Sequence, residues 1–214
     1  NYAVLGAAAL FESISFVIAL RQFRGQSRGR PFWNALHASK DPSTYTVLAE
    51  DGAALARLNA HLPQGAVLVS SDLIRASATA DQLGAGRTRL PHLQDLREFN
   101  LGEWDGKHYT DIAASHPDLS RAYWEQPGDV APPGGESWNA VAARVGAVVD
   151  GLRQQFAQRD IIVVAHVGVI LTQLQVALGV SAYKALSYKI DNLSVTRLDH
   201  GETGWQAGTV NYIA

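Results

Sequence analysis

Two short apolar runs constrain the fold of this chain more than any other feature of its sequence. Residues 66–70 and 161–165 have the length and composition of strands that are buried on both faces of a sheet. A segment with helical character follows each run, at residues 73–83 and 168–178. Because strands that alternate with helices build a mostly parallel sheet, the sequence predicts an α/β fold with helices on both faces.

Other elements complete this α/β pattern. A loop-rich insert with Pro and Gly punctuation occupies residues 87–137, and closing strands are predicted at residues 193–199 and 204–213. Upstream, the Asp-Pro-Ser start signal at residues 41–43 begins a helix that continues to about Leu62. The clearest helix is predicted at residues 138–156, where one apolar stripe contains Val141, Val145, Val148, Val149, Leu152 and Phe156.

The composition excludes several kinds of function. With 18% charged residues and a net charge of −2, the chain has no basic excess of the kind that binds nucleic acid. It contains no cysteine, which excludes disulfides and thiolate metal sites, and its seven histidines lack the spacing of metal ligands. We therefore expect no metal, no cofactor and no nucleic-acid partner.

Three polar residues follow the predicted buried strands. His166 comes directly after the second strand and before a helix, whose amino-terminus can bind an anion. Arg75 follows the first strand, and its guanidinium could hold a phosphate through two hydrogen bonds. Glu98 offers a carboxyl group that could protonate a leaving alcohol. Since parallel α/β sheets build their sites at the carboxyl ends of the strands, we expect these side chains to meet there.

Each of these three residues alone also has a plainer interpretation. A histidine in this position is as often structural as functional. An arginine on a helix is more often a surface charge, and a glutamate in a loop is more often a solvated acid. The combination of the three, in this order and in these contexts, is what favours a site.

Five stretches of the sequence, taken together, resemble the histidine phosphatase superfamily, which has the phosphoglycerate-mutase-like fold. The resemblance covers about residues 51–214 and implies a three-layer α/β/α structure. It also implies that Arg75 and His166 bind phosphate, that His166 and Glu98 are catalytic with Glu98 as proton donor, and that Glu136 and Ser137 brace the pocket. The matching stretches are residues 69–76 (VSSDLIRA), 96–106 (LREFNLGEWDG), 133–137 (PGGES), 164–168 (VAHVG) and 192–196 (NLSVT).

The motif that defines this family, an Arg-His-Gly whose histidine becomes the phosphohistidine, is not found in the sequence. The nearest string is residues 16–23 (FVIALRQF), in which Arg21 follows an apolar run but Gln22 stands where the histidine belongs. Glutamine has no basic lone pair and cannot act as that nucleophile. The resemblance therefore implies a domain without its usual nucleophile.

The absent motif also affects the expected sheet. In the family fold, we expect the strand that carries Arg-His-Gly to lie between the strands at residues 66–70 and 161–165. The predicted fold is therefore a phosphoglycerate-mutase-like sheet that lacks its first strand. Residues 16–20 are the only plausible replacement, but a continuous helix over residues 2–20 is the better interpretation of that segment.

Residues 1–57 carry a second resemblance, to the zinc-transporter-9-like branch of the cation diffusion facilitators. Residues 2–20 are apolar, have about the length that spans a bilayer, and precede a basic stretch, as in a membrane segment. The resemblance implies one membrane helix, a loop and the start of a second helix. In that helix Asp51 falls at a cation-site position, although one carboxylate cannot form a zinc site. The matching stretches are residues 11–13 (FES), 35–42 (ALHASKDP) and 46–54 (TVLAEDGAA).

The two resemblances predict a transporter-like helical segment at residues 1–50 and a phosphatase-like domain at residues 51–214. They meet at about residues 51–58, which suggests a fusion or a fragment. The chain contains no methionine, so we expect it to begin inside a longer sequence.

The leading functional hypothesis is a histidine-phosphatase-family domain that binds phosphate or a small phosphorylated substrate. Intact relatives hydrolyse phosphomonoesters through a phosphohistidine, and we expect this chain to be inactive because the nucleophilic histidine is absent. The alternatives are an active phosphatase that uses an unrecognised nucleophile, and a fragment of a membrane cation transporter. We expect the phosphatase-like domain in the cytoplasm, with membrane contact through residues 2–20 as a further expectation.

Overall fold

The computed structural model describes the backbone of residues 42–214 and the side chains of residues 52–214. The chain divides into two units, residues 1–62 with Ala214, and residues 63–213. The described part of the first unit is helix α3 (Pro42–His61), which confirms the helix predicted to begin near residue 42. The helix expected at residues 2–20, and its membrane contact, lie outside the described residues. Within the described part of the chain, no helix is both long and apolar enough to cross a bilayer.

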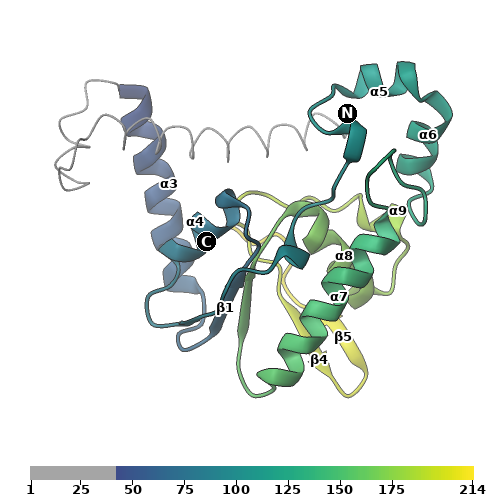
Figure 1. Ribbon diagram of the computed structural model, residues 1–214. Helices are drawn as coiled ribbons and strands as arrows, with labels where there is room; N and C mark the ends of the chain where they lie inside the picture. Colours follow the sequence, from purple (N-terminus) through teal and green to yellow (C-terminus); the bar gives the residue numbers. More distant parts are fainter. Residues whose placement is uncertain (1–41) are drawn as a thin grey trace. The chain divides into compact units, whose positions relative to one another are not determined.

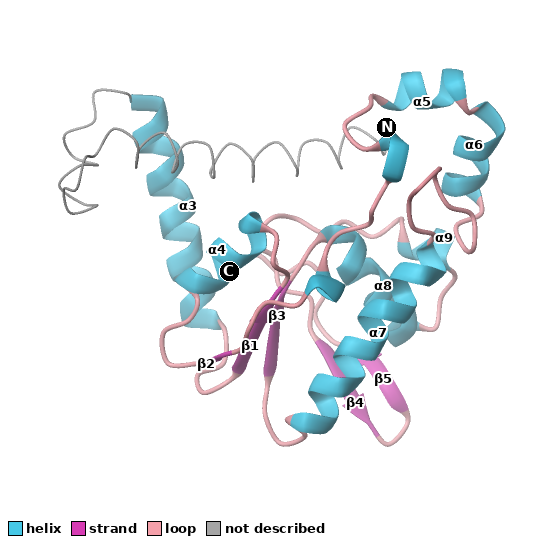
Figure 2. Cartoon of the chain, viewed as in Figure 1, coloured by secondary structure: helices cyan, strands magenta, loops and turns pink. Residues whose placement is uncertain are grey.

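The second unit contains a parallel sheet with the strand order β2-β1-β3 (Figure 2). Strands β1 (Val67–Ser70) and β3 (Ile161–Val164) pair in parallel along their whole length, which confirms that the two apolar runs are neighbouring parallel strands. The expectation that a missing strand lies between them is wrong, because β1 and β3 are hydrogen-bonded directly to each other. The short strand β2 (Thr88–Arg89) pairs with the other edge of β1.

A second, antiparallel sheet stands apart from the first. It consists of β4 (Leu198–Gly201) and β5 (Gly204–Ala207), and a bridge between Val195 and Tyr212 extends the pairing backwards. The closing strands predicted at residues 193–199 and 204–213 are thus present but shorter and shifted. Asn211 has a φ of 55°, outside the extended region, which interrupts the second run. Among the described residues, no strand joins β3 to β4.

Helices flank the parallel sheet of the second unit (Figure 1). The predicted helices at residues 73–83, 138–156 and 168–178 are confirmed by α4, α7 and α8. Ser137 caps α7 by accepting a hydrogen bond from the Ala140 amide, and α8 ends at Gly179 in the left-handed conformation. The helices are α4 (Ile74–Gln82), α5 (Tyr109–Ser115), α6 (Pro117–Glu125), α7 (Trp138–Gln155), α8 (Val167–Leu178) and α9 (Ala182–Ala185), with the 3-10 helices η1 (Gln94–Leu96) and η2 (Gly102–Trp104).

Two apolar clusters hold the sheet and helices of this unit together. Burying one valine or leucine side chain contributes roughly 1.5–3 kcal/mol, so each cluster fixes the positions of the strands and helices that contribute to it. The end of β1 and the start of α8 are therefore held in place, and the polar side chains that follow β1 and β3 emerge from a rigid frame. One cluster contains Val69, Leu96, Val141, Val145, Leu152 and Val169, and the other contains Trp138, Leu171, Leu174, Ala182, Ala185 and Ile190.

Candidate functional site

His166 lies at the point where β3 ends and α8 begins, and its side chain is buried. The Nε of Arg75 donates a hydrogen bond to Nδ1 of this ring over 3.1 Å. A guanidinium can only donate, so Nδ1 must be unprotonated and the proton of the neutral ring sits on Nε2. Nε2 lies 2.7 Å from the hydroxyl of Ser71, which therefore accepts a hydrogen bond from the ring. Both ring nitrogens are thus engaged.

The surroundings of His166 keep the ring neutral. Burial lowers the pKa of His166 from its ordinary value of 6.5 to about 4, and the positive charges of Arg75 and Arg144 act in the same direction. At neutral pH the ring therefore carries no charge. The positive charge of this part of the site comes from the guanidinium of Arg75.

We expect the ring protons of His166 to titrate with a midpoint near pH 4 in NMR spectra recorded without phosphate. Replacing Arg75 with methionine should raise that midpoint, because one cation beside the ring is removed. Since the unfolded chain binds a proton that the folded ring excludes, this group should make the protein less stable as the pH falls from 6.5 towards 4. A midpoint near 6.5 in the unmodified protein would contradict the burial of the ring.

Arg75 lies on the first turn of α4, half-buried, and reaches His166 with Nε alone. Within residues 42–214, no hydrogen bond engages the terminal nitrogens of its guanidinium. A planar guanidinium presents several donors in a fixed fork that matches phosphate or carboxylate oxygens. The geometry therefore leaves a set of donors beside His166 for an anion.

Glu98 lies at the amino-terminus of α8, where sequence reasoning expected an anion to bind. Its Oε2 accepts a hydrogen bond from the Gly168 amide over 3.1 Å, and its Oε1 accepts one from the Phe99 amide over 3.0 Å. The expectation that this helix end is open to phosphate is thus corrected, because a carboxyl group of the chain already occupies the Gly168 amide. Burial raises the pKa of Glu98, although the two amides act in the opposite direction. A raised pKa is what a proton donor requires.

Arg144 is a site residue that sequence reasoning missed. Its guanidinium forms a two-point ion pair with Glu136, with 2.7 Å from Nε to Oε1 and 2.9 Å from Nη2 to Oε2. It also donates to the carbonyl oxygens of Asp95, Arg97 and Glu98 over 2.8–3.2 Å. Arg144 therefore fixes the backbone that carries Glu98, and Glu136 holds Arg144.

A second ion pair, between Arg97 and Asp72, was also missed. It joins the segment after β1 to the segment that carries Glu98, with 2.7 Å from Nε to Oδ1 and 2.5 Å from Nη2 to Oδ2. The sequence did not predict this pair or the pair of Arg144 with Glu136. The partners are 25 and 8 residues apart, beyond the spacing of neighbours on one helix turn, and each residue alone has the pattern of a surface charge. The only available signal was that Arg97 and Glu98 are adjacent.

Neither Ser71 nor His92 is placed to act as a nucleophile in this site. Ser71 accepts the hydrogen bond from His166, so that ring cannot take the Ser71 proton while Arg75 holds its Nδ1. His92 bonds instead to Ser70 and Arg89, away from the Arg75–His166 pair. Across the described part of the chain, no second histidine contacts His166, Arg75 or Glu98, and no cluster of metal-ligating side chains is present.

The sequence model of the histidine phosphatase superfamily, branch 1, matches residues 29–213. Glucosyl-3-phosphoglycerate phosphatase of Mycobacterium tuberculosis is 37% identical over 147 residues, which cover 63% of this chain and 65% of that protein. Phosphoserine phosphatase 1 of Hydrogenobacter thermophilus is 29% identical over 129 residues, 60% of this chain and 61% of that protein. The chain thus spans less than two thirds of these curated relatives.

Solved structures give the same fold. The native structure of the mycobacterial glucosyl-3-phosphoglycerate phosphatase superimposes with a TM-score of 0.65 at 30% identity, covering 78% of this chain and 86% of that one. A structure of the same mycobacterial enzyme with inorganic phosphate gives a TM-score of 0.64 at 29% identity, with the same coverage. YhfR of Bacillus stearothermophilus, at 22% identity, gives 0.68 over 75% of this chain and 82% of that one. The resemblance of residues 1–57 to a transporter stays a prediction.

Proposed function

Because this chain belongs to branch 1 of the histidine phosphatase superfamily, we propose that the site formed by Arg75, His166 and Glu98 binds the phosphoryl group of a small phosphomonoester. The observation that carries the proposal is the Arg75–His166 pair at the carboxyl end of β3, with the terminal nitrogens of Arg75 directed to no other described residue. A structure of a relative that shares 29% of its residues contains inorganic phosphate, and the curated relatives are named for phosphorylated substrates.

In this proposal, phosphate competes with His166 for Arg75. The guanidinium turns its fork towards the phosphate oxygens, and Nδ1 of His166 loses its donor and becomes free to bind a proton. The protonated ring then offers a second charged donor to the anion. Glu98, whose pKa is raised by burial, lies beside the pair and supplies the proton for a leaving alcohol.

We further propose that the site binds phosphate without turnover. A phosphohistidine forms only when an imidazole nitrogen has a free lone pair in line with the phosphorus. In His166, Nδ1 is held by Arg75 and Nε2 carries the proton. Within the described site there is no second imidazole to receive the phosphoryl group. The competing hypothesis is hydrolysis by an unrecognised nucleophile, for which Ser71, at 2.7 Å from His166, is the candidate.

We propose that the chain consists of a phosphatase-like domain at residues 51–214, preceded by a transporter-like helical segment at residues 1–50. The match of the family from residue 29 onwards favours a boundary closer to the amino terminus. Limited proteolysis would locate it: protection of a fragment that begins near residue 29 would overturn the boundary at residue 51.

We expect phosphate to bind weakly, with a dissociation constant of about 1 mM or higher, because the described site offers only two strong donor groups. The His166 ring protons should shift on titration with phosphate. Each charge-assisted hydrogen bond contributes roughly 1.5–3 kcal/mol, so Arg75→Ala should weaken binding about tenfold or more. Arg153→Ala, on α7, removes a half-buried side chain that pairs with Asp150 and not with Arg75, His166 or Glu98, so it should leave binding unchanged. If saturating phosphate leaves the ring protons unmoved, the proposed binding site is absent.

An assay with p-nitrophenyl phosphate separates binding from turnover. We expect no hydrolysis above the level of buffer. Hydrolysis that is abolished by Ser71→Ala would establish the serine as nucleophile. Hydrolysis that is abolished by His166→Ala but persists in Ser71→Ala would place the nucleophile elsewhere in the chain, and either result would overturn the proposal of an inactive site.

A further inference from the structure

The amino-terminus of α8 is capped by a side chain from a distant part of the sequence. The helix begins after His166, whose side chain makes no capping hydrogen bond, and the first amides of a helix have no acceptor within the helix itself. The Gly168 amide donates instead to the carboxyl group of Glu98, 70 residues away. A carboxylate at this end of a helix is stabilised by the helix dipole, so Glu98 takes the place of a local cap.

The backbone of Gly168 gives no reason for a glycine at this position. Gly168 lies in the first turn of α8, and its φ is not positive, so any residue could adopt its conformation. Glycine is also a poorer helix former than alanine. The reason for a glycine therefore has to lie in the atoms that surround its Cα.

Two side chains fill the space beside the Gly168 Cα atom. A Cβ built on Gly168 would lie 2.5 Å from Oε1 of Glu98, and 2.5 and 2.6 Å from Cδ2 and Cε2 of the Phe99 ring. Atoms in good contact lie about 3.5–4.0 Å apart. An alanine at position 168 and the present positions of both side chains therefore exclude each other.

The Phe99 ring has little freedom to move aside. It packs against the ring of Trp138 with 5.7 Å between the centroids. Trp138 is itself buried, and its Nε1 donates a hydrogen bond to Oε1 of Gln175 on α8. A methyl group on residue 168 would thus press the Phe99 ring against a side chain that is already fixed.

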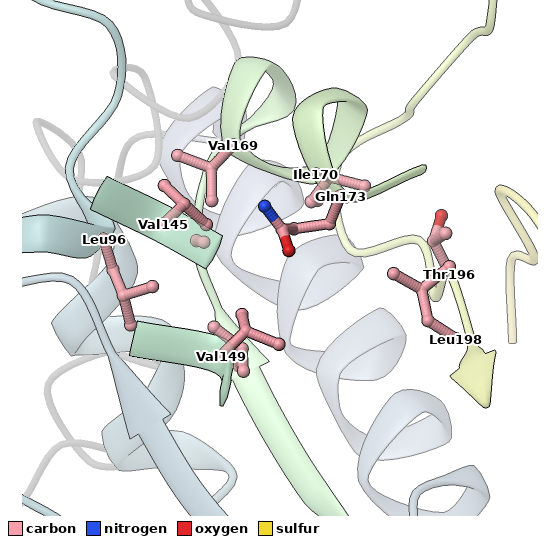
Figure 3. A pocket seen from close by; sticks show the side chains of 10 residues that line it. Leu96, Val145, Val149, Val169, Ile170, Gln173, Thr196 and Leu198 are labelled. Atoms are coloured by element: carbon pink, nitrogen blue, oxygen red, sulfur yellow. The ribbon is translucent and has the colours of Figure 1, made fainter. Parts of the chain in front are cut away.

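The start of α8 cannot shift away from Glu98 either. Val169, the next residue after Gly168, is buried in the apolar cluster that contains Val145 of α7. Figure 3 shows these two side chains next to each other in the lining of an apolar pocket. The Glu98 carboxyl group, in contrast, is held by two amide hydrogen bonds. It is therefore the neighbour that an added methyl group would displace.

We propose that Gly168 is a positioning residue for Glu98, because the absence of a side chain at residue 168 allows the carboxyl group to reach the amino-terminus of α8. This inference rests on the proposed function, in which Glu98 donates the proton to the leaving alcohol. Gly168 acts through Glu98 and not on the substrate. The position that it opens is a buried one, and burial raises the pKa of Glu98, as a proton donor requires.

The titration of Glu98 in Gly168→Ala tests this inference. It is followed by NMR on the side-chain carboxyl carbon, without phosphate, and assigned with Glu98→Gln. In the unmodified protein the midpoint should lie above the ordinary value of 4.5, because of burial. In Gly168→Ala the carboxyl group leaves its buried position, so the midpoint should fall towards 4.5. The ionisable groups that interact with Glu98 are Arg75, Arg144 and Tyr123, and Gly168→Ala changes none of them.

Gly151→Ala is the matched control. Gly151 also lies inside a helix, α7, but a Cβ built there meets no atom within 4 Å, so the Glu98 midpoint should stay where it is. The amide protons of Phe99 and Gly168 give a second readout, since both donate to the Glu98 carboxyl group. Both should follow the Glu98 titration in the unmodified protein and in Gly151→Ala. In Gly168→Ala the Phe99 amide should no longer follow it, which a loss of stability alone would not cause.

An unchanged Glu98 midpoint in Gly168→Ala, or an equal fall in Gly151→Ala, would overturn the inference. If Gly168→Ala does not fold, the comparison is made in Phe99→Leu, which lacks the ring edge that the Cβ would meet. The midpoint should then be lower with Gly168→Ala added than in Phe99→Leu alone, and equal midpoints would overturn the inference. Failure of phosphate to shift the His166 ring protons is a separate result, which would overturn the proposed binding and leave the role of Gly168 to the Glu98 titration.

Discussion

Replacing Gly102 with alanine is expected to lower the free energy of unfolding by about 3 kcal/mol. Gly102 has a φ of 55°, a conformation that costs an alanine roughly 1–2 kcal/mol. An added Cβ would also contact the Pro133 carbonyl oxygen and lie 2.5 Å from the Gly134 carbonyl carbon and the Gly135 amide nitrogen. These are backbone atoms that cannot turn aside, and overpacking of this kind costs typically about 1–3 kcal/mol.

The control for this change is Gly146→Ala in the middle of α7. No atom lies within 4 Å of a Cβ built there, so the methyl group meets open space. Alanine should stabilise the helix by about 0.5–1 kcal/mol relative to glycine. Urea unfolding of the full chain measures both variants. If Gly102→Ala and Gly146→Ala have the same urea midpoint as the unmodified protein, the backbone of Gly102 does not lie as close to residues 133–135 as the structure places it.

The approach at Gly102 also matters for the site. Gly102 comes four residues after Glu98 and two after Asn100 in the sequence. The amide of Glu103 donates a hydrogen bond to the Pro133 carbonyl oxygen. The amide of Asn100 donates to Glu136, the partner of Arg144. A shift at Gly102 should therefore reach the carboxyl group of Glu98, and phosphate binding is a second readout of the same variant.

The strands β1 and β3 could be predicted because the physical signal is local. A strand buried on both faces has to be apolar at successive positions, and residues 66–70 and 161–165 have that property in the sequence itself. The same holds for α7, whose apolar stripe has helical spacing. Arg75 and His166 could be predicted as site residues because they follow the ends of these apolar runs, and parallel sheets build their sites at the carboxyl ends of their strands.

The order of the strands could not be predicted in the same way. The pairing of β1 with β3 depends on hydrogen bonds between segments that are about 90 residues apart. The amino-acid sequence of an apolar strand is the same whichever strand lies beside it, so the sequence does not identify its neighbour. Sequence reasoning therefore placed a missing strand between β1 and β3, whereas those two pair directly. Among the described residues the parallel sheet ends at β3, whose four residues are half-buried.

The electrostatics of the site also depended on contacts that the sequence does not display. The amino-terminus of α8 was expected to attract phosphate, but the carboxyl group of Glu98 accepts the Gly168 amide hydrogen. The proton on Nε2 of His166 follows from the approach of Arg75 to Nδ1. Both the Glu98–Gly168 hydrogen bond and the position of the His166 proton depend on side chains that are far apart in the sequence. Each of them changes the chemistry that is expected of the site, although the residues themselves were predicted.

Replacing Arg144 with methionine is expected to lower the free energy of unfolding by about 3–5 kcal/mol, as is typical when one partner of a largely buried ion pair is removed. The change leaves Glu136 without its guanidinium and the carbonyl oxygens of Asp95, Arg97 and Glu98 without their donor. Arg153→Met is the matched control, because Arg153 lies on the same helix in a longer and more exposed pair, with Asp150 at 3.7 Å. Such a pair contributes about 0–1 kcal/mol.

The two arginine variants also differ in what they should do to the site. Without Arg144 the backbone that carries Glu98 loses its anchor, so the carboxyl group should leave the Gly168 amide. The positive charge that helps to lower the pKa of His166 is also removed, so the midpoint of the His166 titration should rise above about 4 in Arg144→Met and stay there in Arg153→Met. Urea unfolding and NMR titration of both proteins measure these effects. Equal stability and equal midpoints in the two variants would mean that Arg144 is a surface charge, and the bracing of Glu98 would have to come from another residue.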